Sequence, residues 1–98
     1  MISKQDALAF LESHKHIFIE RFGVKHLALF GSVVRDEARE DSDLDILVEF
    51  EGGENYRNYF DLLFFLEDNL HCAIDLVSRD ALRPQLKPYI EKEALYVA

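Results

Sequence analysis

The first 22 residues repeat their apolar side chains at the spacing of an α-helix. A helix is therefore predicted over residues 3–22, with Ser3 as its N-cap and Gly23 as its C-terminal stop. The apolar face of this helix is formed by Ala7, Leu11, Phe18 and Phe22.

Two further apolar segments have the length of buried β-strands. Residues 24–30 (VKHLALF) end in four successive apolar residues, a pattern typical of a strand covered on both faces. Residues 71–77 (HCAIDLV) are apolar around a single acid, Asp75. Both segments are predicted to be strands.

In residues 43–50 (DLDILVEF) every second side chain is apolar, and the side chains between them are acidic except for Leu47. The period of two places Leu44 and Ile46 on one face of a strand, and Asp43 and Asp45 on the other. This segment is predicted to be the second strand, with its two aspartates on a common face.

The remaining segments favour helices. Ser32 is predicted to begin a short helix over residues 33–38, Pro84 to begin a last helix, and residues 93–98 to be extended. A long helix is predicted over residues 55–70. Its apolar residues are interpreted as core packing, and they are Tyr56, Tyr59, Phe60, Leu63, Phe64, Leu66 and Leu70.

This order of elements predicts a small two-layer α/β (α+β) domain that occupies residues 1–98. The short connection between the first two strands permits an antiparallel pair, and the long helix before the third strand favours a parallel pair. We therefore expect a mixed sheet of three strands or slightly more, with helices packed on it.

The composition narrows the possible functions. The 98 residues are 49% hydrophobic and carry a formal net charge of −8. That charge argues against sequence-independent binding of DNA or RNA, which requires a basic surface, and suits a divalent metal or a basic protein partner. With a single cysteine and no long apolar segment, we expect a cytoplasmic protein without disulfides or a membrane span.

The candidate chemistry lies in the spacing G-S-x10-D-x-D, which runs from Gly31-Ser32 to Asp43 and Asp45. Residues i and i+2 of a strand point the same way, with Cα atoms about 6.6 Å apart, so both carboxylates can converge on metal. Without metal, two like charges about 4 Å apart repel by roughly 4 kcal/mol. Ligands that offer only oxygen favour Mg²⁺ or Mn²⁺ over zinc.

Asp75 is a third candidate ligand, because an acid in an apolar strand is unfavourable unless it is paired or bound to metal. The alternative for Asp75 is a buried acid bonded to backbone or to an arginine. Asp41, Asp43 and Asp45 also resemble the start of an EF-hand loop, but the glycine and glutamate that such a loop needs are missing.

The Gly31-Ser32 turn is the candidate phosphate site. Glycine allows an anion to approach the backbone, and the N–H groups at the start of a helix favour negative charge. Arg35 could contact a phosphate, or it could pair on the surface with Asp36 or Glu37. Ser42 could likewise contact a phosphate or cap the local turn.

The segment GSVVRDEAREDSDLDILVEF closely resembles the signature of the DNA polymerase β-like nucleotidyltransferase superfamily. More narrowly, the chain is similar to the minimal nucleotidyltransferases (MNT) that act as antitoxins beside HEPN-domain toxins in prokaryotes. The similarity covers nearly the whole chain, including AIDLVSRDALRP and PYIEKEALYV.

The resemblance implies roles for individual residues. Asp43, Asp45 and Asp75 match the metal-binding, catalytic carboxylates of the family, and Gly31 and Ser32 match its phosphate-binding turn. The implied fold is that of the polymerase β-like nucleotidyltransferases.

The implied activity is transfer of AMP from ATP to a tyrosine hydroxyl of a cognate HEPN ribonuclease, with two Mg²⁺ ions. The implied assembly is a hetero-oligomer of antitoxin and toxin. One departure from the family is Asp36, where relatives often carry glycine after the arginine, here Arg35.

Three hypotheses remain open. The first is an antitoxin that transfers AMP to its toxin, and the second is an antitoxin that neutralises the toxin by binding alone. The third, transfer to a small molecule or to an RNA end, is disfavoured by the short chain and its negative charge. The two closely spaced acids favour the first hypothesis, because binding alone does not need them.

Overall fold

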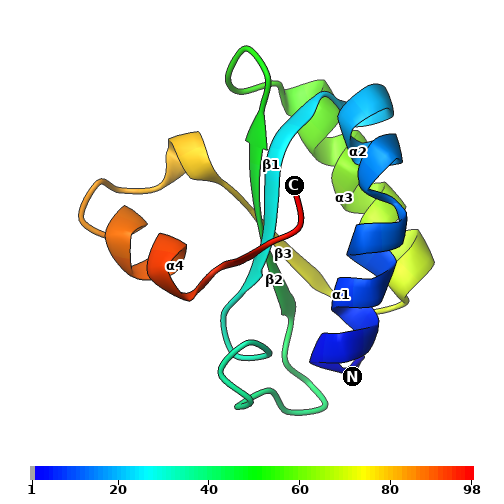
Figure 1. Ribbon diagram of the computed structural model, residues 1–98, viewed down its shortest axis with the longest axis vertical. Helices are drawn as coiled ribbons and strands as arrows, with labels where there is room; N and C mark the ends of the chain where they lie inside the picture. The colour runs from blue at the N-terminus through cyan, green and yellow to red at the C-terminus, as the bar shows by residue number, and fades with distance from the viewer. Residues whose placement is uncertain (1) are drawn as a thin grey trace.

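A computed structural model describes residues 2–98, which form a four-stranded sheet in the order β3-β2-β1-β4 (Figure 1). Strand β1 pairs antiparallel with β2 and with β4, whereas β2 pairs parallel with β3. Along the chain the elements are α1 (Lys4–Ser13), α2 (Lys15–Phe22), β1 (Val24–Phe30), β2 (Leu44–Phe50), α3 (Tyr56–Leu70), β3 (Ile74–Ser78), η1 (Arg79–Ala81), α4 (Lys87–Glu93) and β4 (Leu95–Tyr96).

The two faces of the sheet are covered unequally. Helices α1, α2 and α3 lie together against one face, and α4 lies on the other side of the strands (Figure 1). The larger core cluster lies beneath the three helices and includes Leu11, Phe18 and Leu66, each fully buried. A smaller cluster on the opposite face joins Ala28, Phe30 and Leu47 to Val77, Leu82, Ile90 and Ala94.

The predicted fold class and the direction of both strand pairs are confirmed. The first strand has the predicted bounds, and Gly23 before it adopts the left-handed conformation, with φ of 66°, that ends α2. The fourth strand is short and comes from the segment predicted to be extended, so the sheet is one strand larger than its three predicted members.

The prediction of one helix over residues 3–22 is wrong, because the helix breaks at His14. Three donors converge on the carbonyl oxygen of Phe10: the amide of His14 at 3.1 Å, the hydroxyl of Ser13 at 2.9 Å and Nδ1 of His14 at 2.9 Å. The amide bond is the regular helical bond, whereas the two side-chain bonds to the same carbonyl compete with the helical pattern where α1 ends. The predicted N-cap is confirmed, since Ser3 Oγ accepts the amide hydrogen of Asp6.

The short helix predicted over residues 33–38 is also wrong, since this segment forms successive turns. The Gly31 carbonyl accepts from the amides of Val34 and Arg35, and Asp36 then adopts a left-handed conformation with φ of 58°. Aspartate tolerates this conformation better than most residues, although glycine adopts it at no steric cost. Asp36, where the resemblance implies glycine, thus adopts a conformation that glycine would adopt readily.

Three elements begin later in the structure than in the predictions, namely β2, β3 and α4. The third strand begins at Ile74 because His71, with φ of 54°, is still the C-cap of α3. Pro84 lies in a turn, and α4 begins later, with Pro88 in its first turn, where a missing amide hydrogen is tolerated. The second strand begins at Leu44, one residue later than predicted.

The long helix α3 packs through fewer side chains than its sequence indicates. Leu62, Leu66 and Leu70 are buried, but the predicted core aromatics Tyr56, Phe60 and Phe64 are 74%, 49% and 56% exposed. The interpretation of these three aromatic side chains as core packing is wrong, because the face of α3 that is buried is the one that carries the three leucines. Across residues 2–98, none of the helices combines the length and apolar character needed to cross a membrane.

This difference between neighbours on α3 can be tested by stability. Leu66→Ala is expected to lower the free energy of unfolding by about 2–5 kcal/mol, because the side chain is fully buried. Phe64→Ala, two residues away and mostly exposed, is expected to lower it by less than about 1 kcal/mol. Urea unfolding of the two variants measures both values, and equal losses would contradict the assignment of the buried face.

Candidate active site

The parallel pairing of β2 and β3 places Asp45 directly beside Asp75. Asp45 is partly buried, Asp75 is exposed on the edge strand, and exposed Asp43 lies one residue before β2. The side chains of Asp45 and Asp75 share the sheet face opposite that of buried Ile74 and Leu44, because strand residues alternate. The structure thus joins residues 30 positions apart into one acidic pair, with Asp43 at its edge.

The electrostatics of Asp45 show how closely these acids interact. Partial burial raises the pKa of Asp45 to about 6, and the charge of Asp75 and a hydrogen bond with it contribute further. Asp43 adds a smaller effect of the same sign, whereas a backbone hydrogen bond from Ser32 lowers the pKa. Three carboxylates therefore act on one another around Asp45.

This donor set suits a divalent cation in its chemistry. The carboxylates offer only oxygen and repel one another, and a hard cation such as Mg²⁺ reverses that repulsion. Within residues 2–98, however, no three acidic, histidine or cysteine side chains are gathered closely enough to form a ready-made metal cluster. Asp43 lies outside the strand, so a cation shared by all three acids requires their side chains to converge.

The Gly31 turn lies against Asp45. Gly31 adopts φ of 78°, and a Cβ atom built on it would lie 2.6 Å from Cγ and 2.8 Å from Cβ of Asp45. It would approach Oδ2 of the same side chain still more closely. Only glycine fits this position without displacing the acid, so the predicted phosphate turn and the acidic pair form one continuous site.

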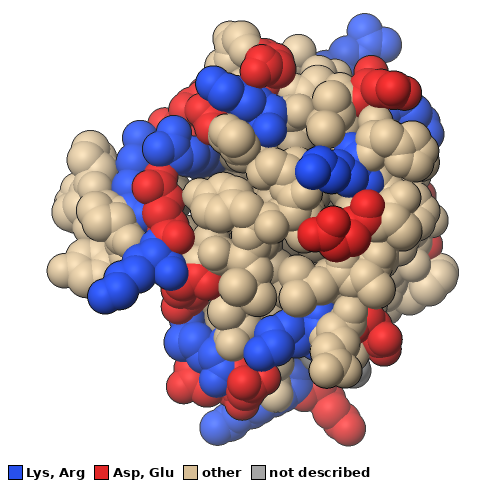
Figure 2. Space-filling view, viewed as in Figure 1, with Lys and Arg blue, Asp and Glu red and all other residues tan. Residues whose placement is uncertain are grey.

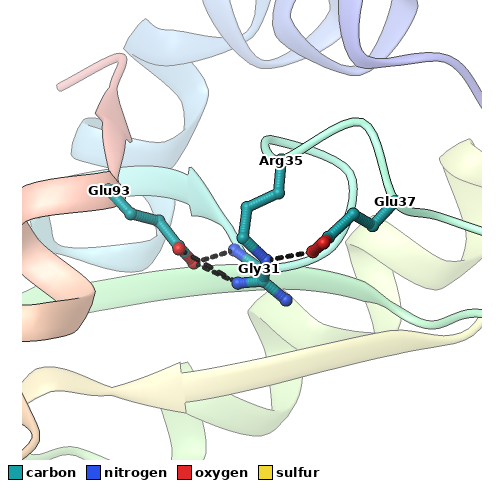
Figure 3. Close-up of polar contacts among 4 residues, drawn as sticks. All are labelled: Gly31, Arg35, Glu37 and Glu93. Carbon is teal, nitrogen blue, oxygen red and sulfur yellow. Dashed lines mark hydrogen bonds and ion pairs between the residues drawn. The ribbon is translucent and has the colours of Figure 1, made fainter.

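Arg35 returns across the turn toward Gly31, and its guanidinium lies between two glutamates (Figure 3). Nε donates to Oε1 of Glu37 at 2.6 Å, and Nη1 donates to the two carboxylate oxygens of Glu93 at 2.9 and 3.0 Å. The predicted pairing of Arg35 with Glu37 is thus present. Asp36, the other candidate, instead pairs with Lys4, at 3.3 Å.

Ser42 caps its local turn, the structural alternative considered for it. Its Oγ accepts the amide hydrogen of Arg39 at 2.9 Å, and its own amide donates to the Arg39 carbonyl at 3.0 Å. A phosphate contact by Ser42 stays a prediction.

Glu93 and Tyr59 make contacts, with the Gly31 turn and with β3 respectively, that the sequence did not single out. Glu93, at the end of α4, accepts the Gly31 amide hydrogen at 2.7 Å, and no sequence spacing indicates that contact across 62 residues. The hydroxyl of Tyr59 donates to the Leu76 carbonyl. Burial and the charge of Asp75 raise the pKa of Tyr59.

Comparison with known proteins identifies the family. A family model described as a nucleotidyltransferase domain matches residues 11–97, and the chain belongs to that family. It is 38% identical over 97 residues to the protein adenylyltransferase MntA of Thermococcus cleftensis, covering 99% of this chain and 98% of that one. The predictions of a nucleotidyltransferase enzyme and of its resemblance to the minimal nucleotidyltransferases are confirmed.

Solved structures share the fold. One, provisionally described as a minimal nucleotidyltransferase, is 36% identical, with a TM-score of 0.81 over 96% of this chain and 95% of the other. A chain of the complex between a tri-AMPylated HEPN toxin of Shewanella oneidensis and an MNT antitoxin is 17% identical, with a TM-score of 0.66. That match covers 93% of this chain and 71% of the other, and at its low identity it shows the fold alone.

The contact between Gly31 and Asp45 predicts the effect of a single methyl group. Gly31→Ala is expected to lower the free energy of unfolding by about 2 kcal/mol or more, from left-handed strain together with overlap with Asp45. Gly52→Ala is the matched control, because Gly52 has φ of 79° but no atom within 4 Å of the added carbon. Equal losses in urea unfolding would show that overlap with Asp45 does not matter.

The raised pKa of Asp45 predicts a dependence of stability on pH. The native carboxyl, with its pKa of about 6, retains its proton above the unfolded value of about 3.9, so the native state binds more protons between these values. Wild type should therefore lose stability relative to Asp45→Asn as pH rises from about 4 to about 6, and the difference should then stay constant.

We expect the difference in the free energy of unfolding between wild type and Asp45→Asn to change by on the order of 1 kcal/mol over this pH range. This change is smaller than the full pKa shift implies, because the carboxyl is partly solvated. Urea unfolding of both proteins in EDTA across this pH range measures it. A difference that is independent of pH would contradict the raised pKa of Asp45, and with it the combined effect of burial and of the neighbouring acids.

Proposed function

We propose that this nucleotidyltransferase transfers AMP from ATP to a tyrosine hydroxyl of a HEPN ribonuclease toxin and thereby neutralises it. The observation that carries this proposal is the placement of Asp45 beside Asp75, directly against the turn at Gly31. One side of the acidic pair can receive a triphosphate, and the other can receive an acceptor hydroxyl. The proposal is supported by the family and by the relative named MntA.

Asp43, Asp45 and Asp75 would hold the divalent ions, with two Mg²⁺ as the expected pair and Mn²⁺ as a substitute. Ions bound there would lower the pKa of an acceptor hydroxyl and neutralise the charge of the triphosphate and of the departing pyrophosphate. The residues of the chain would set the geometry, since phosphoryl-type transfer depends mainly on positioning and on charge neutralisation.

The proposed transfer of AMP needs no reactant other than ATP and the acceptor hydroxyl. The acceptor oxygen forms a bond to the α-phosphorus of ATP, and the bond between that phosphorus and the pyrophosphate oxygen breaks. The hydroxyl proton passes to a carboxylate, for which Asp43 and Asp45 are the candidates. Tyrosine is a suitable acceptor because its unperturbed pKa, about 10, is lower than that of an aliphatic hydroxyl.

The surface of the chain supports a protein partner. Tyr56, Phe60 and Phe64 expose aromatic rings along α3, and exposed apolar groups in a row are typical of protein interaction sites. Figure 2 shows Lys and Arg interspersed with Asp and Glu on the face it presents, without a continuous basic surface there for nucleic acid. A net charge of −8 suits a basic partner, and we propose a hetero-oligomer with the toxin.

An antitoxin that acts by binding alone is the second candidate, because the exposed aromatic residues would serve it equally well. The acids favour catalysis. Partial burial and the neighbouring charge of Asp75 raise the pKa of Asp45 and so disfavour its ionised form, an energetic penalty that a purely binding surface has no need to retain.

The decisive experiment combines this chain, the product of the neighbouring gene, Mg²⁺ and ATP labelled at the α-phosphate. We expect label to move to a tyrosine of the partner with wild type and to stay on ATP with Asp45→Asn, because the proposed metal ligand is lost. Asp61→Asn, which changes an exposed acid on α3, is the control and should transfer label normally.

Toxicity assays with the same variants separate the two candidates. Neutralisation by wild type and by Asp43→Asn/Asp45→Asn to the same extent, with no label transferred by either protein, would refute the enzymatic proposal and leave binding alone.

A further inference from the structure

The carboxylate of Glu93 contacts both parts of the proposed phosphate site. Its Oε1 accepts the Gly31 amide hydrogen at 2.7 Å and a hydrogen from Arg35 Nη1 at 2.9 Å, and its Oε2 lies 3.0 Å from the same nitrogen (Figure 3). These residues come from the end of α4 and from the turn after β1. Bonds between charged groups are among the stronger hydrogen bonds in proteins.

The bond to Gly31 restricts what the turn can offer a nucleotide. A backbone amide has one hydrogen, and that of Gly31 is already donated to Glu93. While Glu93 stays in place, the role of Gly31 is therefore its missing side chain, which leaves room for Asp45. Phosphate contacts must come from other donors of the turn, and Arg35 Nη2 is one, since Nε and Nη1 are the nitrogens engaged by glutamates.

We propose that Glu93 is a positioning residue that holds the Arg35 guanidinium beside the Gly31 turn, with its Nη2 edge directed to the triphosphate of the nucleotide. The inference rests on the proposed function, because it assumes that ATP binds at this turn. Glu93 acts through Arg35 and touches no reacting atom. An arginine fixed before the ligand arrives loses less conformational entropy on binding, which strengthens the complex.

Glu37 contacts the same guanidinium but does not hold it in position. It lies two residues from Arg35 in the same turn, and its side chain is 62% exposed. The Glu93 side chain is only 26% exposed and is carried by α4, outside the turn. Glu93 therefore ties Arg35 to the rest of the fold, whereas Glu37 moves with it.

The proposal predicts the direction in which removal of Glu93 changes the affinity for the nucleotide. Removal of a negative charge near a phosphate site should by itself strengthen anion binding, because like charges repel. If Glu93 positions Arg35, its removal should instead weaken binding. Glu37→Gln removes the same charge from the same guanidinium without releasing it from α4, and is therefore the matched control.

The experiment measures the dissociation constant of Mg-ATP by calorimetry for wild type, Glu93→Gln, Glu93→Ala and Glu37→Gln. We expect both Glu93 variants to bind about tenfold more weakly, the loss typical of one charge-assisted bond, and Glu37→Gln to bind as tightly as wild type or more tightly. In Glu93→Gln an amide oxygen can still accept the Gly31 hydrogen, so the fold of the turn is retained.

A double-mutant cycle with Arg35→Ala distinguishes positioning from general damage. In the Arg35→Ala background, Glu93→Gln should no longer weaken binding of Mg-ATP and should leave it unchanged or tighten it, because Glu93 acts through that arginine and only the loss of its negative charge remains. An additive effect of the two changes would overturn the proposal, as would unchanged or tighter binding by Glu93→Gln alone. Failure of wild type to bind Mg-ATP would instead refute the proposed function.

Discussion

The repulsion between Asp45 and Asp75 is the constraint on which the site depends, and the sheet sustains it. The carboxylates are adjacent because β2 and β3 pair in parallel with these residues in register. The same alternation that buries Leu44 and Ile74 turns both acids to the opposite face, so a shift of one residue would bury the acids and expose the core. Hydrophobic burial therefore supplies the free energy that holds the two like charges together. A bound cation would reduce the repulsion between them.

Much of the fold could be predicted from the sequence, because its signals are local. An uninterrupted apolar run before Gly31 predicts β1, and the length of the connections predicts which strands are parallel. The acids of β2 follow from alternation along the same strand. The contact of Asp45 with Asp75 could also be predicted from the sequence, on the assumption that the third strand pairs with the second.

The errors share a different cause, since each depends on contacts that periodicity does not encode. His14 ends α1 through side-chain bonds to one carbonyl, and Asp36 ends the turn through a left-handed backbone. Phe60 repeats at helical spacing but is 49% exposed, because the buried face of α3 carries Leu62 and Leu66 instead. Glu93 was missed because its partners are far away in sequence and nearby in space.

The link from α4 to the turn also has a consequence for the order in which the site matures. Gly31 and Glu93 are separated by 62 residues, and β4, which follows Glu93, pairs with β1, a central strand of the sheet. The pairing of Asp45 with Asp75 closes a loop of 30 residues, and the longer loop from Gly31 to Glu93 costs more entropy to close. In a refolding chain the acidic pair can therefore form before Glu93 reaches the Gly31 turn. The carboxylates of β2 and β3 would come together first, and the bond between Gly31 and Glu93 would form last.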